Sequence, residues 1–319
     1  MSDLSGPVVV LAGGLSNERD VSLRSGVRIV DALREVGVEV YQRDVDAELI
    51  PALTDDHPAA VFPVVHGATG EDGAVREVLE LLGVPYVGAR PNACRLAFDK
   101  TIAKAVVAEA GITTPAGTAL PHATFRDLGA GAVLERIAAR LKPPLVVKPA
   151  RGGSALGMSV VHDTAELPAA MVGCFSYGDT ALVEHFIAGT ELAVGVVDTG
   201  SGPEALPPVE IVPEDASGYD YAARYTAGET KFFCPARLDD AVIEAVQQTA
   251  LRAHAALGLR HISRSDLIVD ERGEVYLLEV NVAPGMTETS TLPMAATHAG
   301  KPFGQLCRDL IEVAVASAP

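Results

Sequence analysis

The chain has 319 residues, 48% of them hydrophobic, and its 42 acidic residues against 25 basic ones give a formal net charge of −17. This length allows two or three domains with a sizeable core, and so acidic a surface argues against nucleic acid and anionic membranes as partners. The four cysteines are widely spaced, which predicts reduced thiols rather than disulfides. The sequence has no basic segment at its start and no apolar run of about 18 residues, so we expect no signal peptide and no membrane span. Together these features predict a cytoplasmic protein.

The first predicted element is a short buried strand over residues 8–12, which ends at two glycines. A helix and a second strand from Val38 follow, and this order predicts a βαβ unit with a binding crevice at the carboxyl end of the first strand. One face of the helix is predicted to carry Leu23, Val27, Val30 and Leu33. Glu18, just ahead of the helix, could hold a cationic group in the crevice. It could equally be a carboxylate that the helix dipole favours at this end.

A second buried strand over residues 60–65 ends in His66 and a glycine-rich loop through Gly73, which lets backbone approach a ligand. His66 could contact a substrate or be an ordinary hydrogen-bonded histidine. A helix over 74–82 and a strand over 84–87 are predicted to close a first domain near residue 88. A single helix is expected next, from about residue 91 to 110, and it carries Lys100.

Two later stretches have the composition of ligand-covering loops. A predicted strand ending near Lys148 runs into the small-residue loop 151–158, whose backbone N–H groups could bind phosphate beside the lysine. The loop matches neither the Walker A pattern nor GxGxxG, and a plain β-turn is the alternative. Residues 213–231 form a polar, tyrosine-rich insertion, which is typical of a functional lid.

A predicted β-hairpin near the C-terminus carries the most informative side chains. Glu279 and Asn281 are two residues apart on its second strand and therefore point to the same face, where Asp266 of the first strand could join them. Three oxygen-bearing side chains form the ligand set of a hard cation such as Mg²⁺, and Arg264 would place a positive charge beside it. An ordinary solvated hairpin edge is the alternative. Predicted helices over 239–257 and around 306–313 flank the hairpin.

In this order and spacing, these stretches resemble the D-alanine–D-alanine ligases, a branch of the ATP-grasp superfamily, over essentially the full chain. The segments that carry the resemblance are 13–22, 66–73, 99–100, 147–157, 219–236 and 264–287. The resemblance implies an α/β (α+β) fold with three domains. They would be an N-terminal Rossmann-like substrate domain (1–88), a central ATP-grasp domain (89–187) and a C-terminal ATP-grasp domain with the metal and substrate site (188–319).

The resemblance also implies a reaction and its ligands. An ATP-dependent ligase would join two D-alanines through an acyl phosphate to make D-alanyl-D-alanine for peptidoglycan, and members of this family are usually homodimers. The ATP contacts would be Lys100 and Lys148 at the phosphates, Glu184 at the adenine, Glu191 at the ribose, and Arg224, where lysine is common. Two Mg²⁺ ions (or Mn²⁺) would be held by Asp266, Glu279 and Asn281.

The same resemblance assigns roles toward the amino acids. Glu18 would bind the ammonium of the first D-alanine in a subsite lined by His66, and Ser290 would bind the carboxylate of the second. Glu18, Ser154 and Tyr225 would form a hydrogen-bonded set, and Arg264 with the Gly285 N–H would face the oxyanion.

Some positions depart from the common family pattern. Gly152 and Ala155 replace an acidic residue and a serine of the phosphate loop, and Thr291 replaces a frequent leucine, which makes D-serine a candidate second substrate. The alternatives are therefore a ligase of the same fold that uses D-serine or D-lactate, a dipeptide ligase of secondary metabolism, or a nucleotide- or amino-acid-binding protein without catalysis.

Overall fold

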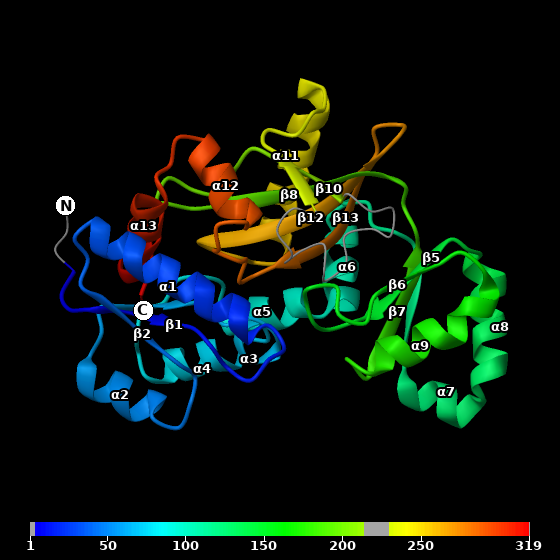
Figure 1. Ribbon diagram of the computed structural model, residues 1–319, viewed down its shortest axis with the longest axis horizontal. Coiled ribbons are helices and arrows are strands. Elements are labelled where there is room, and N and C mark those ends of the chain that lie inside the picture. The colour runs from blue at the N-terminus through cyan, green and yellow to red at the C-terminus, as the bar shows by residue number, and fades with distance from the viewer. Residues whose placement is uncertain (1–3, 214–229, 319) are drawn as a thin grey trace.

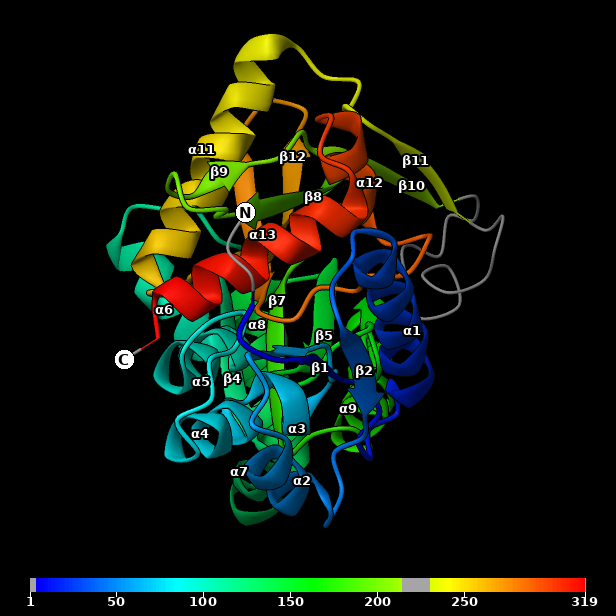
Figure 2. The same cartoon turned by 90° about the vertical axis from the view of Figure 1, so that its left-hand side faces the viewer.

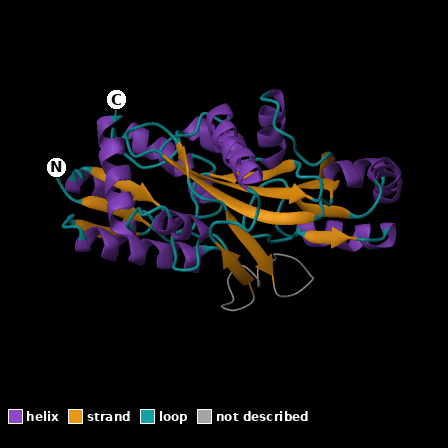
Figure 3. Cartoon of the chain, turned by 90° about the horizontal axis from the view of Figure 1, so that it is seen from above, coloured by secondary structure: helices purple, strands orange, loops and turns teal. Residues whose placement is uncertain are grey.

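The computed structural model describes residues 4–213 and 230–318. Three β-sheets with their covering helices lie side by side along the longest axis of the molecule (Figures 1 and 3). In chain order they are a parallel N-terminal sheet, a smaller antiparallel sheet and a larger antiparallel sheet, so the chain is a mixed α/β protein.

The N-terminal sheet has the parallel strand order β2-β1-β3. Its strands are β1 (Val8–Leu11), β2 (Val40–Arg43) and β3 (Ala60–Pro63). Helices α1 (Arg19–Glu35) and α13 (Phe303–Ala316) pack on one face, and α2 (Leu49–Asp56) and α4 (Ala74–Leu81) on the other. The unbroken apolar run of β1 is fully buried because helices cover both faces of the sheet.

Two details of this unit differ from the prediction. Val27 of α1 is 54% exposed, whereas Ser22 and Ser25 are fully buried on the inner face. The Ser22 hydroxyl donates to the Val64 carbonyl at 2.7 Å, and the Ser25 hydroxyl accepts the Met286 N–H at 3.1 Å, so both are paired and can be buried. The predicted strand over 84–87 is reduced to one parallel bridge between Val61 and Tyr86.

The central sheet has the antiparallel order β4-β7-β5-β6. Its strands are β4 (Gly117–Pro121), β5 (Leu145–Pro149), β6 (Ser159–Val161) and β7 (Thr180–His185). Three α-helices and one 3₁₀ turn accompany it: α7 (His122–Leu128), α8 (Ala130–Leu141), α9 (Leu167–Phe175) and η1 (Thr164–Glu166). β4 was not anticipated from the sequence, because only its central residues are partly buried and it has no clear apolar alternation.

The C-terminal sheet runs β11-β10-β8-β12-β13, with β9 paired to β8. Its strands are β8 (Gly189–Val197), β9 (Glu204–Ala205), β10 (Val209–Pro213), β11 (Thr230–Phe233), β12 (Ile262–Asp270) and β13 (Val275–Asn281). Helices α5 (Pro91–Phe98), α6 (Lys100–Glu109) and α11 (Asp240–Ala256) pack against one apolar cluster of this sheet, and α12 (Thr291–His298) packs against β8.

The prediction of a single helix from 91 to 110 is wrong, because the chain breaks at Asp99. This residue has extended backbone angles, and its carboxylate accepts the N–H groups of Thr101 and Ile102 as the N-cap of α6. A new helix therefore starts at Lys100 and gives that lysine a fixed direction.

The hydrophobic cores cross the expected domain boundaries. One cluster joins β1 and α1 to the C-terminal helices α12 and α13, and another joins α5 and α6 to the C-terminal sheet. Figure 2 shows α13 between the N-terminal unit and the C-terminal sheet. The division at residues 88 and 187 stays a prediction. In the described part of the chain, no helix has the length and apolar character needed to cross a bilayer.

Candidate active site

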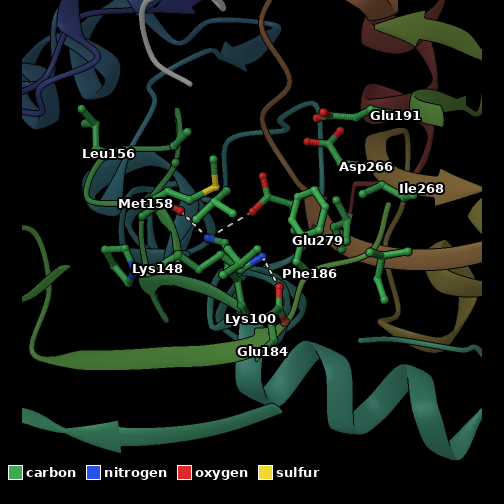
Figure 4. A pocket seen from close by; sticks show the side chains of 18 of the residues that line it. Lys100, Lys148, Leu156, Met158, Glu184, Phe186, Glu191, Asp266, Ile268 and Glu279 are labelled. Atoms are coloured by element: carbon green, nitrogen blue, oxygen red, sulfur yellow. Dashed lines mark hydrogen bonds and ion pairs between the residues drawn. The ribbon is translucent and has the colours of Figure 1, made fainter. Parts of the chain in front are cut away.

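Two adjoining cavities lie between the sheets and share the lining residues Gly153, Asp266 and Glu279. The first is bounded by β5, β7 and the C-terminal hairpin, and it contains Lys100, Lys148, Glu184 and Glu191 (Figure 4). The second contains Glu18, His66, Ser154, Arg264, Asn281, Gly285, Ser290 and Thr291. Thus every predicted site residue in the described ranges lines one cavity or both. Arg224 and Tyr225 lie outside the described residues.

The hairpin β12–β13 brings four predicted residues to one face. Asp266 is the register partner of Glu279, and Arg264 that of Asn281, so the predicted convergence is confirmed. The Arg264 guanidinium donates two hydrogen bonds to Asp266, at 2.6 and 2.8 Å, and Lys100 Nζ lies 3.2 Å from Glu279. Both carboxylates are thus already balanced by a cation.

The donor set of this hairpin suits a hard divalent cation. Two carboxylates and one amide oxygen are ligands that Mg²⁺ accepts while keeping water and phosphate oxygens as its other ligands. Asn281 uses Oδ1 to accept the Ala283 N–H at 2.8 Å, which fixes the orientation of its amide. Among the described residues there is no group of three or more His, Cys, Asp or Glu side chains that could hold a metal by itself. A metal here would take Asp266, Glu279 and Asn281 together with water or phosphate oxygens as its ligands.

Lys148 and Glu184 line the first cavity, and together with Lys104 they form a buried cluster of three charges. Lys148 Nζ lies 2.6 Å from Glu184, and Lys104 contacts the other oxygen of the same carboxylate. Burial alone would raise the pKa of Glu184, but the two lysines lower it below its ordinary value. Burial, reinforced by the charge of Lys148, lowers the pKa of Lys104 to about 8.

Lys104 was missed in the sequence. It lies four residues after Lys100 on α6, so both lysines share a helix face, and that spacing is the signal that could have revealed it. In Figure 4, Lys100 and Lys148 point toward Glu279 and Glu184 respectively. Both lysines that line the cavity are thus paired with carboxylates, Lys100 with Glu279 and Lys148 with Glu184.

The loop after β5 connects the two cavities. Ser154 and Ala155 adopt left-handed backbone angles (φ 53° and 55°), which non-glycine residues rarely do. This conformation directs the Ser154 hydroxyl onto the Glu18 carboxylate, to which it donates a hydrogen bond. The loop is also tied at its start, because Arg151 Nε donates to Asp99 at 3.0 Å and Lys100 Nζ donates to the Gly152 carbonyl at 2.5 Å.

Glu18 is a buried carboxylate at the N-terminus of α1. Burial and the nearby charge of Glu71 raise its pKa, and the hydrogen bond from Ser154 only partly opposes this. Glu71, which the sequence did not single out, lies 3.7 Å from His66 Nδ1, and His66 Nε2 is buried with no hydrogen-bond partner in the described part of the chain. This end of the second cavity is therefore anionic and suits an ammonium group.

The opposite end of the second cavity is a turn that leads into α12. The Thr287 N–H donates to the Ser290 hydroxyl at 3.0 Å, so Ser290, although it is the N-cap residue, makes no side-chain cap for its own helix. The first N–H groups of α12 have no partner within the helix and, with the helix dipole, favour an anion there. A Cβ at Gly285 would lie 2.8 Å from the Ser290 hydroxyl, so any side chain at that position would displace this hydroxyl.

Comparison with known proteins identifies the family. The sequence model described as D-ala D-ala ligase C-terminus matches residues 106–312, and that described as D-ala D-ala ligase N-terminus matches residues 42–89. The chain belongs to the D-alanine–D-alanine ligase family. A D-alanine–D-alanine ligase of Anaeromyxobacter dehalogenans is 40% identical over 98% of this chain and 97% of its own length. That of Bordetella avium is 38% identical over 96% of this chain and 94% of its own length.

Solved structures of D-alanine ligases have the same fold. The VanG D-Ala:D-Ser ligase from Enterococcus faecalis superposes with a TM-score of 0.82 at 27% identity, covering 97% of this chain and 99% of its own. The D-alanine–D-alanine ligase from Coxiella burnetii gives 0.81 at 26% identity, covering 98% of this chain and 95% of its own. The predicted family and ATP-grasp fold class are confirmed, and ATP use follows from membership of this ligase family. The roles of individual site residues stay predictions.

Proposed function

We propose that this protein is an ATP-dependent ligase that joins two D-alanines into D-alanyl-D-alanine for peptidoglycan synthesis. The observation that carries the proposal is the meeting of two unlike cavities at Asp266 and Glu279. One is lined by buried lysines, as a nucleoside triphosphate requires. The other has a buried carboxylate at one end and a serine with a helix N-terminus at the other, as an amino acid substrate requires. Curated relatives that match nearly the whole chain are named for this reaction.

The proposed reaction has two steps. The carboxylate oxygen of the first D-alanine, whose ammonium is held by Glu18, attacks the γ-phosphoryl group of ATP and releases ADP. The amine of the second D-alanine then attacks the acyl phosphate and releases inorganic phosphate. Arg264 and Gly285 line the second cavity, and we assign the guanidinium and the Gly285 N–H to the oxyanion of that step. Loss of one such donor typically slows a reaction about 100- to 1000-fold.

The chain's charged residues support the first step. Lys100 and Lys148 are assigned to the phosphates, Glu184 and Glu191 to the nucleoside, and the loop 151–158 to excluding water, which would hydrolyse an acyl phosphate. Asp266, Glu279 and Asn281 would hold Mg²⁺, which when bound neutralises charge on the transferring phosphoryl group. A cytoplasmic location and a homodimer stay predictions from the sequence.

Thr291 is the residue of the second cavity that bears on the choice of the second substrate. Thr291 lines the second cavity, so a hydroxyl group is available where the family often has leucine. D-Alanine remains the proposed acceptor, and D-serine and D-lactate are the competitors to offer in the assay.

Phosphate release and dipeptide formation, measured with ATP, Mg²⁺ and D-alanine, test the proposal. Turnover with D-alanine is expected, and its absence with every D-amino acid would favour a binding protein instead. Glu279→Gln keeps the side-chain size and removes one carboxylate charge. It should abolish turnover while leaving the melting temperature nearly unchanged, and a near-normal rate would contradict the metal assignment.

A further inference from the structure

The turn that forms the far end of the second cavity is held from outside by α1. Arg28 Nη1 donates to the Met286 carbonyl at 2.9 Å and to the Thr287 carbonyl at 2.5 Å. On the same helix, the buried Ser25 hydroxyl accepts the Met286 N–H at 3.1 Å. The helix that begins beside Glu18 at one end of the cavity thus fixes the backbone at its other end.

The hydrogen bond from Arg28 to Thr287 also affects Ser290, because Thr287 and Ser290 are hydrogen-bonded to each other within one turn. The Thr287 carbonyl accepts the Ser290 N–H at 3.1 Å, and the Thr287 N–H donates to the Ser290 hydroxyl at 3.0 Å. The two side-chain hydroxyls are also 2.9 Å apart. Because Ser290 directly precedes α12, any shift of the Thr287 carbonyl moves both the Ser290 hydroxyl and the first N–H groups of that helix.

We infer that Arg28 is a positioning residue for the second amino acid substrate. It does not line the cavity, but its guanidinium sets the position of the turn on which the assigned carboxylate contact, Ser290, is placed. The inference rests on the proposed function. It assigns control of acceptor binding to a residue in the N-terminal unit, far in sequence from the site that it shapes.

The surroundings of Arg28 allow its charge to be removed without loss of the fold. The guanidinium lies 4.3 Å from the centre of the Phe303 ring, on the outer side of the interface between α1 and α13. The core beneath that interface consists of apolar residues such as Ile29, Leu33 and Leu310. Methionine at position 28 keeps an apolar stem against Phe303 and removes the hydrogen-bond donors together with the positive charge.

Arg24 provides a matched control. It lies one turn earlier on α1, faces the same outer groove as Arg28, and makes no hydrogen bond or ion pair with any other described residue. Arg24→Met removes the same charge from the same helix without touching the turn. Arg28→Lys tests whether a different donor can restore the position of the turn. One nitrogen of Arg28 now donates to both carbonyls, and the single ammonium of a lysine could do the same.

The experiment measures phosphate and dipeptide together over a range of D-alanine and ATP concentrations. Phosphoryl transfer needs only the first D-alanine, so a displaced second subsite leaves acyl phosphate to react with water, giving back D-alanine and phosphate. For Arg28→Met we expect more than one phosphate per dipeptide, a half-saturating D-alanine concentration raised about tenfold, and an unchanged KM for ATP. Arg28→Lys should recover part of the loss, and Arg24→Met should match the unmodified protein.

Three results would overturn the inference. Arg28→Met could behave like Arg24→Met. It could also lower the melting temperature and raise the KM for ATP together with that for D-alanine, which would indicate a merely structural role. Failure of the unmodified protein to release phosphate with D-alanine would instead remove the proposed function, and the inference with it.

Discussion

At the scale of the single residue, the charge and the burial of the Glu18 carboxylate conflict. It must be ionised to hold an ammonium group, yet burial and the charge of Glu71 raise its pKa. A bound ammonium supplies the missing positive charge and would favour the ionised form. The conflict therefore makes binding of the first amino acid sensitive to pH.

We predict that kcat/KM for D-alanine falls as the pH is lowered through the raised pKa of Glu18, at a pH above that expected for an exposed glutamate. The reason is that the protonated carboxyl cannot pair with the ammonium. A pH–rate profile at saturating ATP measures this, with the KM for ATP as the control. The Glu18→Gln variant should lose most of its activity, and its remaining kcat/KM should no longer fall at acidic pH. If the variant stays active and its kcat/KM still falls at the same pH, the assignment of Glu18 is contradicted.

At the level of elements, the break between α5 and α6 sets the direction of Lys100. The Asp99 carboxylate caps α6 and accepts a hydrogen bond from Arg151 at the start of the glycine-rich loop. One side chain thus connects the helix that carries Lys100, the lysine assigned to the phosphates, to the loop assigned to cover them.

We predict that Asp99→Ala lowers the free energy of unfolding by about 1–2 kcal/mol and raises the KM for ATP, because the cap and the tie to the loop are both lost. Asp99→Asn keeps a capping oxygen and should retain most of the stability while still weakening the pair with Arg151. Chemical denaturation and ATP kinetics distinguish the two variants. Equal loss of stability in both would refute the capping role.

The sequence predicted these elements unevenly, for physical reasons. The hairpin of Asp266 and Glu279 was predictable because alternation along a strand determines which side chains share a face. The buried face of α1 was predicted only in part: Val30 and Leu33 are buried as expected, but Ser25 is polar and becomes buried only through a partner more than 250 residues away. The pairing of Lys104 with Glu184 likewise depends on a tertiary contact between α6 and β7.

At the scale of the whole molecule, two buried histidines lie beside the C-terminal sheet, and one of them, His261, contacts the end of the first unit. His261 Nδ1 accepts the Gly88 N–H at 3.1 Å, and His254 Nδ1 lies 2.8 Å from the Ser263 hydroxyl. Burial lowers the pKa of each to about 4, from an ordinary value of 6.5. Protonation of His261 at Nδ1 would also break its bond to Gly88.

We predict that the free energy of unfolding decreases as the pH falls from about 6.5 toward 4, by on the order of 3 kcal/mol per histidine. The folded-state pKa values are lowered, so the unfolded chain binds more protons in this window, and the full stability is present only above it. Urea denaturation at several pH values measures the slope. In the His254→Gln variant, the free energy of unfolding should depend less steeply on pH in this range. An unchanged dependence on pH would show that protonation of His254 does not cause the loss of stability.

The shared core of β1, α1 and α13 also has a consequence for synthesis of the chain. The N-terminal strands leave the ribosome well before α13, which covers part of one face of their sheet and follows them far along the chain. Apolar side chains on that face therefore remain exposed to water, or to a chaperone, until α13 has also been made. The N-terminal unit cannot complete its core on its own.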